Sequence, residues 1–166
     1  FEKSIAKTVG ANFAIAMNSA TSALHVACKA IGLKNGDYLW TTPNSFVASA
    51  NCGIYCGADV DFVDISFESG LISIDKLKLK LEEAEKEGKL PKVLIPVHFS
   101  GSSCDMESIY KLANHYEFHV IEDASHAIGG KYQNQPVGNC RFSSIVVFSF
   151  HPVKIITTAE CGMSTT

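Results

Sequence analysis

Ser144 to Lys154 reads Ser-Ile-Val-Val-Phe-Ser-Phe-His-Pro-Val-Lys, and the rest of the chain is understood most easily from this stretch outward. The run from Ile145 to Phe148 has the length and β-branched content of a buried strand, and it leads to the hydroxyl of Ser149. Lys154 stands alone among apolar and hydroxyl-bearing neighbours. Apolar surroundings favour the neutral amine, which is the form that attacks a carbonyl carbon to make a Schiff base. Alternatively, the side chain runs from the end of the strand to water, as lysines commonly do.

Apolar runs of strand length alternate with helical patterns along the chain. They predict strands over residues 13–17, 38–42, 60–63, 92–98, 118–122 and 145–149, the first of them buried. Helical patterns cover residues 23–31, 45–56, 76–87 and 105–116, and Asn44 and Asp75 are expected to cap the second and third helices. This alternation is typical of an α/β protein with a mostly parallel sheet and helices on both faces. Because ligands of such sheets bind beyond the carboxyl ends of the strands, the polar residues there are the candidates for a site.

Composition excludes several classes of protein. With 166 residues, of which 46% are hydrophobic and 19% charged, the chain is expected to form one globular domain. The net charge of −3, with scattered lysines and arginines, predicts no nucleic-acid partner. No apolar run approaches the roughly 20 residues that span a bilayer, so no membrane association is expected. The start has neither a methionine nor a signal peptide, and we expect the chain to begin inside a longer protein.

The six cysteines have neither the spacing of a zinc site nor that of a disulfide framework. No Cys-x-x-Cys pair occurs, and no group of histidines and cysteines has metal-ligand spacing. We therefore expect buried free thiols in a reducing cytoplasm, and no bound metal.

Asn18-Ser19-Ala20-Thr21-Ser22 lies between a predicted strand and a predicted helix. Its small residues let the backbone approach a ligand, and the free N–H groups at a helix N-terminus attract a phosphate. Ordinary capping of the helix by a serine or threonine is the alternative interpretation. The stretch is not a Walker loop or a dinucleotide-binding fingerprint, because the glycines that define those motifs are absent.

Two further segments place chemically useful side chains after predicted strands. Phe46 could stack on a flat heteroaromatic ring, although an aromatic residue in the first turn of a helix is more often part of the core. Asp123 follows an apolar strand, with His126 just behind it. A carboxylate there can hold a pyridinium nitrogen in its protonated form. The alternatives are a helix-capping Asp with a structural His, or a hydrolytic Asp–His pair, although no Gly-x-Ser-x-Gly elbow accompanies them.

Each of these signals is weak alone, but together they predict one cofactor. Pyridoxal 5′-phosphate needs a lysine for its aldehyde, an acid for its ring nitrogen and a helix N-terminus for its phosphate. A parallel sheet can supply all of these at one edge.

The same segments resemble the DegT/DnrJ/StrS family of pyridoxal-phosphate-dependent nucleotide-sugar aminotransferases, and they occur in the family's order. The similar segments are Asn-Ser-Ala-Thr-Ser-Ala-Leu-His (18–25), Thr-Thr-Pro-Asn-Ser-Phe-Val-Ala-Ser-Ala-Asn (41–51), Glu-Asp-Ala-Ser-His-Ala-Ile-Gly (122–129) and Ser-Phe-His-Pro-Val-Lys-Ile-Ile-Thr-Thr-Ala-Glu (149–160). The chain is most similar to the family's enzymes of pseudaminic acid biosynthesis. The resemblance implies the fold of aspartate aminotransferase (type I). Residues 1–166 would then form part of its large domain, which binds the cofactor.

The resemblance also implies a role for each candidate residue. Lys154 would form the Schiff base and shuttle a proton, and Asp123 would pair with the pyridinium nitrogen. The other implied cofactor contacts are Ala20, Thr21 and Ser149 to the phosphate, Phe46 stacked on the ring, and His126 near the phenolic oxygen.

By the same resemblance, L-glutamate donates the amino group and C4 of a UDP-4-keto-6-deoxy-N-acetylhexosamine receives it, in a cytoplasmic homodimer. The chain departs from the family at Cys161, where glycine is usual and where the larger side chain is expected to crowd the turn. Compared with the family, we expect an N-terminal segment and the small C-terminal domain to lie outside residues 1–166. The alternatives are a different nucleotide-sugar aminotransferase, a catalytically inactive fragment or a binding module on the same fold. Related dehydratases carry histidine in place of the lysine, and Lys154 argues against that reaction.

Overall fold

The computed structural model describes the whole chain, from Phe1 to Thr166. Its helices are α1 (Glu2–Val9), α2 (Ala20–Ala30), α3 (Ala48–Tyr55), α4 (Ile74–Glu87) and α5 (Met106–Tyr116), with a 3₁₀ turn, η1 (Phe99–Gly101). The main strands are β1 (Ala14–Met17), β2 (Tyr38–Thr41), β3 (Asp59–Phe62), β4 (Val93–Ile95), β5 (His119–Asp123), β8 (Ile145–Ser149) and β9 (Gly162–Thr165). A small hairpin is formed by β6 (Lys131–Tyr132) and β7 (Gln135–Pro136).

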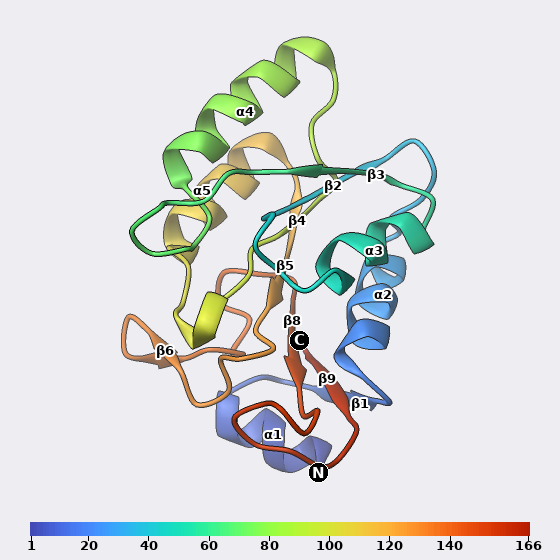
Figure 1. Cartoon of the computed structure of the whole chain (residues 1–166), viewed down its shortest axis with the longest axis vertical. Coiled ribbons are helices and arrows are strands. Elements are labelled where there is room, and N and C mark those ends of the chain that lie inside the picture. Colours follow the sequence, from blue (N-terminus) through green and yellow to red (C-terminus); the bar gives the residue numbers. More distant parts are fainter.

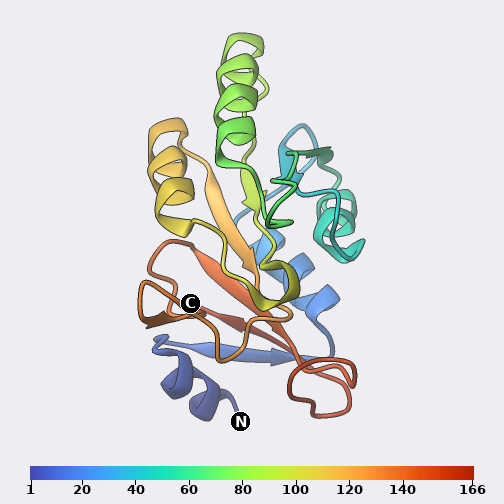
Figure 2. The ribbon, with the colours of Figure 1, turned by 60° about the vertical axis from the view of Figure 1, so that its left-hand side comes forward.

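One seven-stranded sheet runs through the molecule in the order β1-β9-β8-β5-β4-β2-β3. The neighbours from β8 to β3 are parallel, whereas β9 is antiparallel to both β1 and β8. Helices α2 and α3 cover one face of the sheet, and α4 and α5 cover the other (Figures 1 and 2). The prediction of an α/β fold with a mostly parallel sheet is therefore confirmed.

Alternation along the strands explains why both faces are covered. In β2, the fully buried Leu39 packs toward α2 and α3, and its neighbour Trp40 packs toward α4 and α5. In β4, Leu94 shares the side of Trp40. Because successive strand residues point to opposite faces, a strand that is apolar throughout needs a helix layer on each side. Each such side chain contributes roughly 1.5–3 kcal/mol on burial, so these layers hold the strand ends in place.

The N-terminal strand differs from its prediction as a buried strand. Ile15 is 52% exposed, and β1 pairs only with β9, which makes it an edge strand. Helix α1, which the sequence analysis did not predict, packs beneath this edge (Figure 2). It buries Ile5 and Val9, which lie one helical turn apart.

Two predicted helix caps are wrong. Helix α4 is capped by Ser73, whose hydroxyl accepts from the Lys76 amide, and Asp75 lies in the first turn. Asn44 does not cap α3, because its side-chain amide donates to the Gly70 carbonyl at 2.7 Å. A long-range hydrogen bond replaced the local one in that case. None of the helices combines the length and the hydrophobicity that a membrane span requires.

Candidate active site

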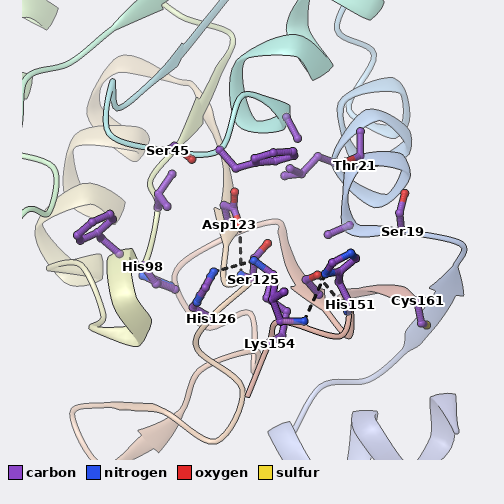
Figure 3. A pocket seen from close by; sticks show the side chains of 18 of the residues that line it. Ser19, Thr21, Ser45, His98, Asp123, Ser125, His126, His151, Lys154 and Cys161 are labelled. Carbon is purple, nitrogen blue, oxygen red and sulfur yellow. Dashed lines mark hydrogen bonds between the residues drawn. The ribbon is translucent and has the colours of Figure 1, made fainter. Parts of the chain in front are cut away.

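A cavity of about 480 Å³ opens where β4, β5 and β8 end, beside the N-terminus of α2. Polar residues that follow different strands meet there, as Figure 3 shows. Every residue that the sequence analysis predicted for the site lies in the wall of this cavity: Ala20, Thr21, Phe46, Asp123, His126, Ser149 and Lys154.

The predicted Schiff-base lysine is paired with the predicted histidine. Lys154 Nζ lies 2.7 Å from His126 Nε2, although the two residues come from separate loops (Figure 3). Lys154 itself is partly buried. Its apolar neighbours do not enclose it as the sequence suggested, because Val153 is 73% and Ile155 62% exposed. Within this chain, the lysine is therefore placed by a hydrogen bond to an imidazole more than by apolar burial.

This pairing sets the charge state of His126. Burial and the nearby Lys154 ammonium lower the pKa of His126, while Asp123 acts in the opposite direction. At neutral pH the imidazole is therefore uncharged, and Nε2 can accept a hydrogen bond from Nζ.

The titration of His126 provides a direct check. In the cofactor-free protein, NMR should place its midpoint below the ordinary value of about 6.5, and Lys154→Met should raise that midpoint because a cation has been removed. Lys131→Met, in the β6–β7 hairpin, is the control and should leave it unchanged. The pKa of His126 is higher in the unfolded chain than in the folded one. The free energy of unfolding should therefore fall as the pH drops from about 6.5 through the folded-state midpoint. If Lys154→Met left the titration midpoint of His126 unchanged, the pairing of Lys154 with His126 would be contradicted.

Asp123 is buried at the end of β5, and its carboxylate is held from two sides. Oδ1 accepts from the Ser125 amide at 3.1 Å, and Oδ2 accepts from the hydroxyl of Ser49 at 2.6 Å. In Figure 3, Asp123 lies near the middle of the site. A carboxylate that is fixed in this way at the cavity wall can pair with a cationic ring nitrogen without reorganising.

The N-terminus of α2 provides free hydrogen-bond donors at one end of the cavity. Ser19 caps the helix by accepting from the Ser22 amide, so the expected capping occurs. The amides of Ala20 and Thr21 make no hydrogen bond within the protein, and they are available together with the hydroxyls of Thr21 and Ser149. An eleven-residue helix adds its dipole to these donors.

Gly162 at the start of β9 lets this end of the cavity form. A Cβ atom at this position would lie 2.2 Å from the carbonyl of Ser19, so any other residue would push the strand and the helix apart. The adjacent Cys161 is half-buried, and its φ is outside the left-handed region. Its Sγ lies 3.2 Å from the Gly162 carbonyl. The expected crowding by Cys161 is therefore absent, and the position that needs glycine is the next one.

Phe46 is not a core residue, because 74% of it is exposed although it lines the cavity. A large aromatic ring that is uncovered at a cavity wall is suited to stack on a flat ligand. Its position agrees with the stacking interpretation of the sequence and excludes the core interpretation.

Sequence reasoning missed two groups at this site. One is Ser49, which binds Asp123 from 74 positions away in the sequence. The other is His98, which lines the cavity and is only 1% exposed. The Cys104 amide donates to its Nδ1, so Nε2 carries the proton and donates to Glu122 at 2.7 Å. Only the position of His98 as the last residue of a predicted strand could have indicated it.

Comparison with known proteins identifies this architecture. The model of the DegT/DnrJ/EryC1/StrS aminotransferase family matches residues 1–166. The chain belongs to this family. Pyridoxal phosphate is the cofactor of the family's aminotransferases, and the lysine, the acid and the helix N-terminus of this cavity fit its aldehyde, ring nitrogen and phosphate.

Individual relatives agree with the family match. A Campylobacter jejuni (serotype O:23/36) UDP-4-amino-4,6-dideoxy-N-acetyl-β-L-altrosamine transaminase is 40% identical over 162 residues, which are 98% of this chain and 41% of the relative. The structure of PseC from Helicobacter pylori, an aminotransferase of pseudaminic acid biosynthesis, has a TM-score of 0.89 and 35% identity, and the similarity covers 99% of this chain and 43% of PseC. The pyridoxal-phosphate form of the putative sugar aminotransferase Spr1654 from Streptococcus pneumoniae gives a TM-score of 0.87 at 26% identity, covering 99% of this chain and 44% of that one. The chain thus spans less than half the length of the relatives that it matches.

Proposed function

We propose that the protein carrying this chain is an aminotransferase that moves an amino group, supplied by L-glutamate, to C4 of a UDP-4-keto-6-deoxy-N-acetylhexosamine. The observation that carries this proposal is the convergence of Lys154 and Asp123 on one cavity, with α2 pointing its N-terminus into it. When bound, pyridoxal phosphate supplies an electron-withdrawing ring that carries the amino group between the two substrates. The sugar substrate is inferred from the relatives, whose names refer to a UDP-linked sugar and to pseudaminic acid biosynthesis.

Different residues of this chain would bind different parts of the cofactor. Ala20, Thr21 and Ser149 would bind the phosphate through amide and hydroxyl donors. Phe46 would cover one face of the ring, and Asp123 would hold the proton on the ring nitrogen. These contacts fix the ring from its phosphate end, its face and its nitrogen.

Lys154 and His126 would handle the remaining chemistry. Lys154 Nζ would hold the cofactor through its aldehyde carbon, whose oxygen leaves as water, and the amine, when free, would take and return the substrate proton. His126 Nε2 lies close enough to accept from the lysine, and in its neutral form it would also donate from its other nitrogen to the phenolic oxygen of the ring. This hydrogen bond would hold Nζ in place at this side of the cavity.

We also propose that residues 1–166 form part of the cofactor-binding domain of a longer, cytoplasmic, homodimeric enzyme. Its six cysteines are all free thiols, which agrees with a reducing compartment. The outer sides of α2 and α3 and the segment before α3 carry exposed apolar side chains that a second subunit would cover. These side chains are Val26, Val47, Ile54 and Tyr55.

Product analysis tests the proposed reaction. The protein that carries this chain would be given pyridoxal phosphate, glutamate and a panel of nucleotide-linked 4-keto and 3-keto sugars. We expect 2-oxoglutarate and a 4-amino sugar in equal amounts with UDP-linked 4-keto-6-deoxy substrates. The matched 3-keto and GDP-linked sugars should react more slowly. Amino transfer to none of the 4-keto sugars would overturn the proposal.

A further inference from the structure

The mechanism above leaves one buried hydroxyl beside the site unexplained. Ser49 is completely buried in the first turn of α3, and its Oγ lies 2.6 Å from Asp123 Oδ2. A serine near a helix N-terminus ordinarily caps the helix, but α3 has no side-chain cap. The hydroxyl instead binds a carboxylate on a different strand. Since a buried hydroxyl costs free energy unless it is hydrogen-bonded, this contact is what accounts for a serine at position 49.

The hydrogen bonds around Ser49 have a single possible direction. A carboxylate has no proton to give, so Ser49 donates to Asp123. Its one proton is then used, and the hydroxyl of Ser45, 2.7 Å away, must donate to Ser49. Ser45 lines the cavity, so a directed chain of two hydroxyls runs from the cavity wall to the buried carboxylate.

This chain also ties the acid to the aromatic residue of the site. Phe46 lies between the two serines in the sequence, and the Ser49 amide donates to the Phe46 carbonyl at 3.1 Å. Asp123 and the segment that carries the Phe46 ring are therefore held at a fixed separation by Ser49. A cofactor ring in the cavity could then contact Asp123 through its nitrogen and Phe46 through its face at the same time.

We propose that Ser49, supported by Ser45, is a positioning residue that aims the Asp123 carboxylate at the ring nitrogen of the cofactor. The proposal rests on the proposed function, because it needs pyridoxal phosphate in the cavity. Ser49 touches neither cofactor nor substrate in it, and acts through Asp123. Its effect should therefore depend on whether the ligand has a ring nitrogen.

The test compares the dissociation constants of pyridoxal phosphate and of its 1-deaza analogue, in which carbon replaces the ring nitrogen. The protein that carries this chain should prefer pyridoxal phosphate, and Ser49→Ala should reduce this preference about 10-fold, the equivalent of one hydrogen bond to a charged group. A merely structural role would weaken both ligands equally. Ser49→Cys has nearly the same volume but a poor donor, so it should behave like Ser49→Ala.

A matched control removes a buried hydroxyl that makes no hydrogen bond. Ser164 on β9 is also buried, and its Oγ has no hydrogen-bond partner, so Ser164→Ala should leave the preference unchanged. If Ser49→Ala fails to fold, Ser49→Cys alone decides the outcome. Suppose that the wild type binds pyridoxal phosphate and transaminates, but the Ser49 variants keep its full preference for pyridoxal phosphate over the 1-deaza analogue. This result would overturn the role of Ser49 and leave the proposed function intact. A wild type that binds neither ligand would overturn both.

Discussion

Lys154→Ala is expected to lower the rate of transamination by at least about 10³-fold, within the range that acid–base catalysis contributes. The variant loses both the amine that bonds to the cofactor and the group that moves the substrate proton. No other lysine lines the cavity, so nothing in this chain can replace it. The measurement is the formation of 2-oxoglutarate from glutamate by the protein that carries this chain, with the visible absorption of the bound cofactor as a second readout.

Two controls separate the amine from its charge. Lys154→Arg keeps a cation at this position, but a guanidinium stays protonated and cannot bond to an aldehyde, so this variant should be equally inactive. Lys78→Ala removes a lysine that is exposed on α4, and it should retain full activity. Turnover close to wild type in Lys154→Arg would mean that the residue acts only through its charge.

Asp123→Asn should reduce the rate about 10²- to 10³-fold, as expected when one preorganised electrostatic group is lost. The asparagine side chain has nearly the same shape, but it is neutral and cannot hold a proton on the ring nitrogen. The loss should appear mainly in kcat, because the contacts of the phosphate end and of Phe46 remain. Steady-state kinetics with the unmodified protein and the variant provide the comparison.

Asp75→Asn is the matched control for the loss of a carboxylate. Its side chain is 93% exposed in the first turn of α4, so its replacement should leave kcat unchanged. If Asp123→Asn turned over at the wild-type rate, the ring nitrogen would not be facing this carboxylate.

The strands and most helices could be predicted because their signals are local. The runs around Leu39, Leu94 and Val147 have the length and composition of strands, and burial on both faces follows from their lack of polar alternation. Helix α1 carried a usable signal in the spacing of Ile5 and Val9, but with only eight residues it was easily overlooked.

The arrangement of β9 and the caps depended on contacts between distant residues. No local pattern states that β9 inserts between β1 and β8 with reversed direction. Asparagine is a common helix-capping residue, and only the hydrogen bond to Gly70 in the folded chain shows why Asn44 does not cap α3. The pairing of β9 and the hydrogen bond of Asn44 both depend on residues that are distant in the sequence, and a single sequence does not reveal these contacts.

The site could be predicted to the extent that strand ends in a parallel sheet converge. Asp123 and Ser149 are the last residues of β5 and β8, so their place in one cavity follows from topology. The pairing of Lys154 with His126 joins two loops, and the contact of Ser49 with Asp123 joins a helix to a strand. Neither has a spacing in the sequence that would identify it.

The central claim is that Lys154 holds pyridoxal phosphate covalently in this cavity. Reduction with borohydride makes such a bond permanent, and mass spectrometry of the digested protein then identifies the modified residue. We predict a phosphopyridoxyl group on the peptide that contains Lys154, and its absence when the cofactor is omitted. A modification on another lysine, or on none, would contradict the account.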